Sequence, residues 1–166
     1  VDYSSSTTGI TVTLANDGAL TSVSHNISGV FIDNLTNIEG IKGSSTVSNT
    51  LTGNNMNNTL IGGNQADVIK GGSGNNYLNG GAGINTIYAG TGSDTIIGGS
   101  ADANWLYYTD VLGANVNVNL KAGIATYGTS TDTISQIRHL QMGNGTNTVE
   151  GNSDANSFVG GTGTDT

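Results

Sequence analysis

Residues 51–104 divide into six consecutive nine-residue units, which read LTGNNMNNT, LIGGNQADV, IKGGSGNNY, LNGGAGINT, IYAGTGSDT and IIGGSADAN. The first position of every unit is aliphatic, namely Leu51, Leu60, Ile69, Leu78, Ile87 and Ile96. The third and fourth positions are mostly glycine, and the eighth reads Asn58, Asp67, Asn76, Asn85, Asp94 and Ala103. A fixed short period is the signature of an architecture in which each unit stacks on its neighbours.

The unit length of nine residues sets the geometry. A strand of about three residues needs one inward side chain, and glycines in the remaining positions allow the positive φ angles that a tight turn demands. Two units then complete one coil, with strands on opposite walls stacked at about 4.8 Å per coil. The sequence therefore predicts an all-β fold, a parallel β-roll or β-solenoid, with three coils in residues 51–104.

The rest of the chain is interpreted as an internal duplication. Residues 1–50 form a strand-rich flanking module, in which Ile10, Val12 and Leu14 alternate with threonine and a turn at residues 16–18 predicts a hairpin. Residues 105–139 repeat this plan as a second strand-rich module, and residues 140–166 resume the nine-residue units. In this duplication, Val1 and Tyr3 correspond to Trp105 and Tyr107, respectively. Likewise, Ile10, Val12 and Leu14 correspond to Val116, Val118 and Leu120, and residues 33–38 correspond to residues 132–137.

The two ends of the chain match each other in register. After Phe158, the next inward position would be residue 167, and Val1 supplies an apolar residue at that place in the pattern. We therefore expect a tandem unit of a longer protein, or a protomer that continues head to tail with other copies of itself.

Composition narrows the classes of partner. The chain of 166 residues has a formal net charge of −8, 27 glycines and no cysteine. This charge argues against nucleic acid and anionic membrane surfaces as partners and favours cations. The longest apolar runs are a few residues, so insertion into a membrane is not expected. Without cysteine, disulfides and thiolate metal sites are excluded.

Several units are similar to a known calcium-binding repeat. IYAGTGSDT, IKGGSGNNY and FVGGTGTDT resemble the RTX, or haemolysin-type, nonapeptide, and residues 1–4, 10–14 and 33–41 resemble the linker module that precedes such runs in secreted bacterial proteins. The resemblance implies a parallel β-roll, an extracellular or cell-surface location, and Ca²⁺ as cofactor. It also implies that aspartates at position eight of units two apart hold the ion, together with backbone carbonyls of the glycine-rich turns.

The chain departs from this pattern at the ligand positions. The candidate metal-ligating residues are Asp67, Asp94, Asn49, Asn58, Asn76, Asn85, Asn147, Asn156 and Asp165. No two units that lie two apart both offer a carboxylate, so the affinity for calcium should fall. Either calcium binds weakly at the Asp67 and Asp94 turns, or stacked asparagines hydrogen-bond along the roll and replace the ion.

Other signals are weaker. Position two should point outward, so one wall would show Ile61, Asn79 and Ile97, either covered by the strand module or free as a contact surface. His25 and His139 are the only histidines, and no nucleophile-elbow motif accompanies them. We therefore expect no catalytic residues and no enzyme activity.

Two functional hypotheses follow. The first is a non-enzymatic structural repeat unit of a secreted bacterial protein, such as an extracellular filament, surface layer or adhesin stalk, that stacks head to tail and binds calcium at some turns. The alternative is an accessory calcium-binding repeat domain of a secreted lipase, protease or alginate epimerase, where it aids secretion, folding or carbohydrate binding. Surface polysaccharide is a possible partner in either case.

Overall fold

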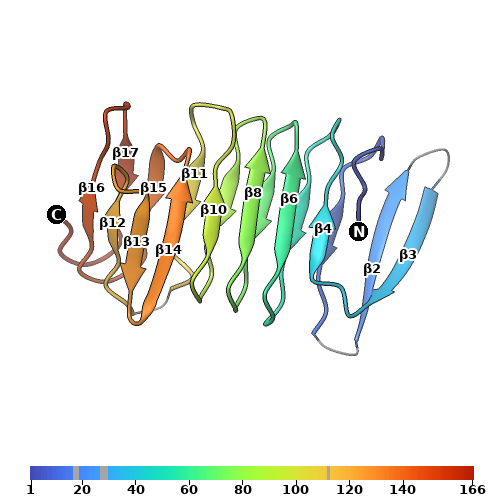
Figure 1. The fold of residues 1–166 in the computed structure, drawn as a ribbon, viewed down its shortest axis with the longest axis horizontal. Coiled ribbons are helices and arrows are strands. Elements are labelled where there is room, and N and C mark those ends of the chain that lie inside the picture. Colours follow the sequence, from blue (N-terminus) through green and yellow to red (C-terminus); the bar gives the residue numbers. More distant parts are fainter. Residues whose placement is uncertain (17–18, 27–29, 112) are drawn as a thin grey trace.

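Short strands stack along one axis into two facing walls (Figure 1). The computed structural model describes residues 1–166 except 17–18, 27–29 and 112. The seven-stranded wall contains, in spatial order, β1 (Thr11–Thr13), β5 (Thr50–Thr52), β7 (Val68–Lys70), β9 (Thr86–Tyr88), β11 (Trp105–Tyr107), β15 (His139–Gln141) and β17 (Ser157–Val159). The eight-stranded wall contains β16 (Thr148–Glu150), β12 (Asn117–Asn119), β13 (Ile124–Tyr127), β14 (Ser130–Ser135), β10 (Thr95–Ile97), β8 (Tyr77–Gly81), β6 (Thr59–Gly63) and β4 (Gly40–Lys42).

Strands of the repeat run pair in parallel with the strand two units away. In the seven-stranded wall, Leu51 lies opposite Ile69, which lies opposite Ile87. In the eight-stranded wall, Leu60, Leu78 and Ile96 are related in the same way. Two units thus make one coil of eighteen residues, and the predicted parallel β-roll is confirmed.

The core of the roll is a single file of aliphatic side chains. All six predicted inward residues are fully buried, as are Leu106 and Leu140 further along the chain. Burial of each such side chain stabilises the fold by about 1.5–3 kcal/mol. Because each coil of the run contributes only two of these side chains, no coil is stable without its neighbours.

Glycine allows the coils to approach closely. Gly81 has a φ of 86°, and a Cβ at this position would lie 2.1 Å from the carbonyl oxygen of Gly63 in the coil below. Any larger residue would therefore meet both backbone strain and a clash.

The first strand module is arranged differently from the expected hairpin. β1 joins the seven-stranded wall beside β5, whereas β2 (Leu20–Asn26) pairs antiparallel with β3 (Val30–Thr36) in a separate two-stranded sheet. The chain does turn after β1, where Ala19 N donates to Asn16 O, but Asp17 and Gly18 lie outside the described residues. After this turn β2 lies against β1, but the ladder that the structure describes for β2 is the one with β3, so the hairpin forms one strand later than the turn predicts.

The second strand module is built into the roll. β12, β13 and β14 pair antiparallel in succession, and this meander lies between β10 and β16 within the eight-stranded wall. β4 and β15 start the two repeat runs on opposite walls, so the second run is half a coil out of phase with the first. Strands from all four predicted segments contribute to one continuous pair of walls.

The sixth unit contains one residue more than the sequence suggests. Leu106, rather than Trp105, lies opposite Ile87 and is fully buried. Position eight of this unit is consequently Asn104, not Ala103. The duplication shifts by one residue as well, because Tyr108 N donates to Gln141 O as Tyr3 N donates to Lys42 O. Tyr3 is therefore equivalent to Tyr108, and the predicted pairing with Tyr107 was wrong.

The strand modules lie at the ends of the repeat run rather than over its walls (Figure 1). Tyr77 on β8 remains 36% exposed, so the interpretation that a module covers the wall with Ile61, Asn79 and Ile97 was wrong. Across the described residues, the structure holds no helix of the length and apolarity needed to span a bilayer.

Candidate metal sites in the turns

Side chains at position eight form hydrogen-bonded ladders along the roll. In the first ladder, Asn49 N donates to Asp67 Oδ1 at 2.7 Å, Asp67 N to Asn85 Oδ1 at 2.9 Å, and Asn85 N to Asn104 Oδ1 at 2.9 Å. All four side chains are buried, so each bond pairs a backbone N–H that water cannot reach. The predicted asparagine ladder is thus present in the structure, with Asp67 as one member.

A second ladder runs along the opposite edge. Asn58 N donates to Asn76 Oδ1 at 2.9 Å, and Asn76 N donates to Asp94 Oδ1 at 2.7 Å. Asp94 N then donates to Asp132 Oδ1 at 2.8 Å, although 38 residues separate the two. Asp94 and Asp132 therefore occupy successive places on one ladder, and the prediction that no such places both offer a carboxylate was wrong.

Sequence reasoning missed Asp132 because it belongs to β14 and not to a nine-residue unit. The meander of β12 and β13 interrupts the period, so counting in steps of eighteen does not reach it. A local signal was nevertheless present: the same three residues, Asp-Thr-Ile, begin at Asp94 and at Asp132 and enter the two strands in the same register.

At the asparagine turns, the side-chain amide donates to carbonyl oxygens of the turn. Asn85 Nδ2 lies 3.0 Å from Gly83 O and 3.0 Å from Gly98 O. Asn49 and Asn76 follow the same rule, with Nδ2 donating to the carbonyl two residues earlier, that of Val47 and of Gly74. Asn104 donates to the carbonyl of Ala101, three residues earlier, and Asn58 donates instead to Asn54 Oδ1. An NH₂ group thus occupies the place toward which these acceptors point.

Asp67 and Asp94 put an acceptor in that place instead of a donor. Each side chain is buried, 1% and 2% exposed, and among the described residues the Oδ2 atom of each has no hydrogen-bond partner. Burial raises the pKa of Asp67, and burial together with the charge of Asp132 raises the pKa of Asp94 to about 7. A buried carboxylate facing carbonyls requires either a proton or a cation.

The oxygens around Asp67 converge from two coils. A Cβ built on Gly62 would lie 2.4 Å from Asp67 Oδ2 and 2.5 Å from Gly80 O. By register, the carbonyl two residues before Asp67 is that of Gln65. Carboxylate and carbonyl oxygens are the ligands that Ca²⁺ prefers, so the residues of this turn fit the ion. They would hold it with Asp67 and the backbone carbonyls of Gln65 and Gly80.

The Asp94 turn is partly filled by tyrosine. Tyr127 donates its hydroxyl to Gly92 O at 2.7 Å, which is the carbonyl two residues before Asp94. Tyr108 donates to Asp132 Oδ2 at 2.8 Å, and the Tyr127 hydroxyl lies 3.3 Å from Asp132 Oδ1. Asp132 is therefore satisfied by protein donors, and the free oxygen of Asp94 is the remaining candidate ligand at this turn.

The candidates in the second run lie apart from these two turns. Asn147 donates from both its backbone N and its Nδ2 to Asp165 Oδ1, and its Oδ1 accepts from Val116 N. Asn156 closes its own turn by accepting from Asn152 N at 2.9 Å. The predicted ligand set is thus divided among separate turns. In the described part of the chain, no group of three or more His, Cys, Asp or Glu side chains surrounds one point.

Comparison with known proteins agrees with this geometry. The family model of the RTX calcium-binding nonapeptide repeat (4 copies) matches residues 52–87, 79–102 and 143–166. No curated protein and no solved structure matches the chain. All three matched segments lie within the two runs of nine-residue units, so the chain carries RTX calcium-binding nonapeptide repeats.

Proposed function

We propose that the chain is a non-enzymatic structural repeat unit of a secreted bacterial protein: an extracellular filament, surface layer or adhesin stalk whose roll calcium stabilises. The observation that carries the proposal is the passage of the roll through the second strand module without a break. β10 pairs with β14 and β9 pairs with β11, so both repeat runs share one core. Such a core grows in length only, which suits a stalk or fibre.

Calcium contributes stability at the Asp67 turn and, more weakly, at the Asp94 turn. When bound there, the ion would neutralise a buried carboxylate that otherwise lacks a partner. Because calcium binds the folded turns and not the unfolded chain, it raises the free energy of unfolding. The asparagine turns need no ion, since their amides already donate to the turn carbonyls.

The test is thermal unfolding of the full chain with excess chelator and with millimolar calcium. We expect a higher melting temperature with calcium, and a smaller shift in the double variant Asp67→Asn, Asp94→Asn. The matched control is Asp110→Asn, which removes an exposed carboxylate of equal charge from a turn outside the ladders. Equal melting temperatures with chelator and with calcium would contradict the proposed role of the ion.

One observation favours the alternative of an accessory domain that binds carbohydrate. On the outer side of the seven-stranded wall, the rings of Tyr88 and Tyr107 stack at 4.7 Å and those of Trp105 and His139 at 5.0 Å. Lys70 Nζ lies 5.0 Å from the centre of the Tyr88 ring. Partly exposed rings in a row offer the apolar faces on which sugar rings pack.

Gel electrophoresis in the presence of neutral and acidic polysaccharides would test this alternative. Retardation that is lost in Tyr88→Ala and Trp105→Ala, and kept in Tyr77→Ala on the opposite wall, would support carbohydrate binding. If none of the polysaccharides changes the migration of the protein, carbohydrate binding by the aromatic row is contradicted.

A further inference from the structure

The chain contains, at its centre, a complete example of how one strand module stacks on the end of a repeat run. In this internal junction, β14 lies on β10 with Thr133 opposite Thr95 and Ile134 opposite Ile96. β11 lies on β9, with Leu106 opposite Ile87. Both walls of the run thus continue directly into strands of the module.

The first module reproduces the contacts of this junction residue by residue. Tyr3 donates its hydroxyl to Asp33 Oδ2 at 2.8 Å, as Tyr108 does to Asp132 Oδ2 at 2.8 Å. The ring of Tyr3 packs on that of His25 at 4.9 Å, where Tyr108 packs on Tyr127 at 5.7 Å. The same correspondence holds at the following run, where Ile10 N donates to Asn49 Oδ1 and Val116 N donates to Asn147 Oδ1.

The two modules differ in what covers them. Asp132 is fully buried under β10, whereas the side chain of its counterpart Asp33 is 41% exposed. Among the residues that the structure describes, β3 forms the outermost strand at the N-terminal end of the roll (Figure 1). The exposed edge of β3 corresponds to the edge of β14 that β10 covers.

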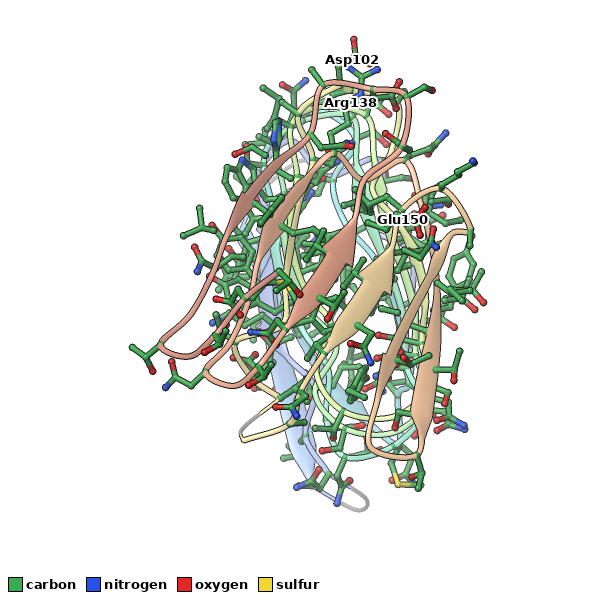
Figure 2. All side chains as sticks on the ribbon, turned by 90° about the vertical axis from the view of Figure 1, so that its left-hand side faces the viewer. Asp102, Arg138 and Glu150 are labelled. Atoms are coloured by element: carbon green, nitrogen blue, oxygen red, sulfur yellow. The ribbon has the colours of Figure 1, made fainter. Side chains whose placement is uncertain are left out.

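The opposite end of the roll has the complementary surface. Phe158 on β17 is 51% exposed and Val159 is 44% exposed, although Ile96 at the equivalent inward position of the first run is fully buried. Figure 2 looks onto this end, with Arg138 and Asp102 at its rim and Glu150 below them. An apolar strand edge that ends a sheet in this way is a template for pairing with a further strand.

We infer that β17 of one copy pairs in parallel with β3 of a second copy, in the register of the internal junction. Ser157 then lies opposite Asn34, Phe158 opposite Leu35, and Val159 opposite Thr36. Val1 of the second copy stacks on Val149, as Leu106 stacks on Ile87. This inference rests on the proposed structural function and adds to it the identity of the two surfaces, their order and their register.

The pairing satisfies groups at both ends. In the internal junction, Asp132 Oδ1 accepts a hydrogen bond from the backbone N–H of Asp94. In the proposed interface, Asp33 corresponds to Asp132 and Asn156 to Asp94, so Asp33 Oδ1 accepts the backbone N–H of Asn156. Leu35, which already packs against the core, covers Phe158 as Ile134 covers Ile96. The β2–β3 hairpin lies against β1, the end strand of the seven-stranded wall to which β17 belongs, so β17 meets the module that adjoins its own wall.

Cysteine cross-linking tests this register directly, because the native chain has no cysteine. One protein carries Ser157→Cys and a second carries Asn34→Cys; they are mixed and oxidised, or treated with a short bis-maleimide. We expect the heterodimer to form about a hundredfold faster than by random collision, because docking raises the effective concentration of the two thiols. All substituted residues are exposed, and unchanged melting temperatures confirm that both variants fold.

The matched control replaces Asn34→Cys with Ser22→Cys, which lies opposite Asn34 on β2, one strand farther from the junction. Equal cross-linking of residue 157 to residues 22 and 34, or faster 34–34 or 157–157 homodimers, would overturn the inference, as would the absence of any acceleration. The outcome is independent of the calcium experiment. If cross-linking fails while calcium still raises the melting temperature, only the proposed interface is contradicted. If cross-linking succeeds while calcium has no effect on the melting temperature, only the proposed role of the ion is contradicted.

Discussion

At the scale of single residues, the turns of this roll differ by one atom. An asparagine places a donor nitrogen among the carbonyl oxygens of its turn, as Asn85 does, and an aspartate places an oxygen there, as Asp67 does. The amide closes the turn without help, whereas the carboxylate leaves a buried acceptor that costs about 1–3 kcal/mol when unpaired. The choice of residue at position eight therefore decides which turns depend on an ion.

The variant Asp67→Asn should consequently stabilise the chain in chelator, by about 1 kcal/mol, because the new amide gains turn carbonyls as acceptors. In saturating calcium the same change should remove most of the stabilisation by the ion. Urea unfolding under both conditions measures the two effects. The reverse change, Asn85→Asp, places a second carboxylate next to Asp67 on the ladder and should increase the dependence on calcium. Destabilisation by Asp67→Asn in chelator would contradict the assignment.

Stability without calcium should depend on pH. Burial, assisted by Asp132, raises the pKa of Asp94 from 3.8 to about 7, and burial raises the pKa of Asp67 and Asp132 in the same direction. Between these values the folded chain binds more protons than the unfolded chain, so the free energy of unfolding falls as the pH rises from about 4 to about 7.

Melting temperatures in chelator at pH 5 and pH 8 check this expectation. The temperature should be lower at pH 8, and saturating calcium should reduce the difference because the ion takes the place of the proton. In Asp94→Asn the slope should be smaller. A chelated protein that becomes more stable over this range would show that Asp94 is ionised in the fold at low pH.

At the scale of the element, the turn glycines set how closely coils stack. Gly81→Ala combines positive φ with a Cβ 2.1 Å from Gly63 O, whereas Gly113, with a φ of 72°, has no atom within 4 Å of its Cβ position. We expect Gly113→Ala to cost about 1–2 kcal/mol, the strain of a left-handed backbone alone. Gly81→Ala should cost clearly more, and chemical denaturation of the two variants separates strain from crowding. Equal losses would mean that the coils move apart without penalty.

The sequence predicts these elements well where its period is unbroken. Each inward residue from Leu51 to Ile96 was recognisable because a nine-residue unit must bury the same position every time. The prediction failed where the chain inserts something. One extra residue in the turn before Asn104 moves Leu106 inward, and the meander before β14 brings Asp132 onto the ladder of Asp94.

Long-range contacts account for the remaining differences. Tyr127 reaches Gly92 O across 35 residues, and no local pattern indicates that a tyrosine hydroxyl will close that turn. The ladder partner of β2 could not be inferred from the turn at residues 16–18 either, because β2 pairs with β3, the strand that follows it, and not with β1, the strand before the turn. Local periodicity thus predicts the architecture of the roll, whereas the chemistry of its turns depends on contacts between segments that are far apart in the sequence.

At the scale of the whole molecule, the proposed interface has one unfavourable feature. In the register of the internal junction, Glu150 of one copy lies beside Asp2 of the next, at the places of Tyr88 and Tyr107. Asp2 is paired with Lys42 at 3.5 Å, which reduces the repulsion without cancelling it. Like charges at such a surface position cost about 0.2–1 kcal/mol and are screened by salt.

Glu150→Gln should therefore strengthen self-association, by up to about fivefold in affinity at low salt. Sedimentation velocity over a range of concentrations measures this, and the gain should shrink at high salt. Asp110→Asn, which changes the net charge equally on a turn outside the ladders and outside the proposed strand pairing, is the control. If both variants associate equally better, overall charge and not the junction would be responsible.

The second repeat run is half a coil out of phase with the first, and this offset has a consequence for any longer assembly. The first hairpin lies against β1 at the end of the seven-stranded wall and the meander lies in the eight-stranded wall, so two modules bring the walls back to their starting order. Successive copies would then share one orientation, and the ring pair of Tyr88 and Tyr107 would recur on the same flank of every copy. The resulting ribbon would have two unlike sides, an aromatic one suited to lie against a surface and another free to face the medium.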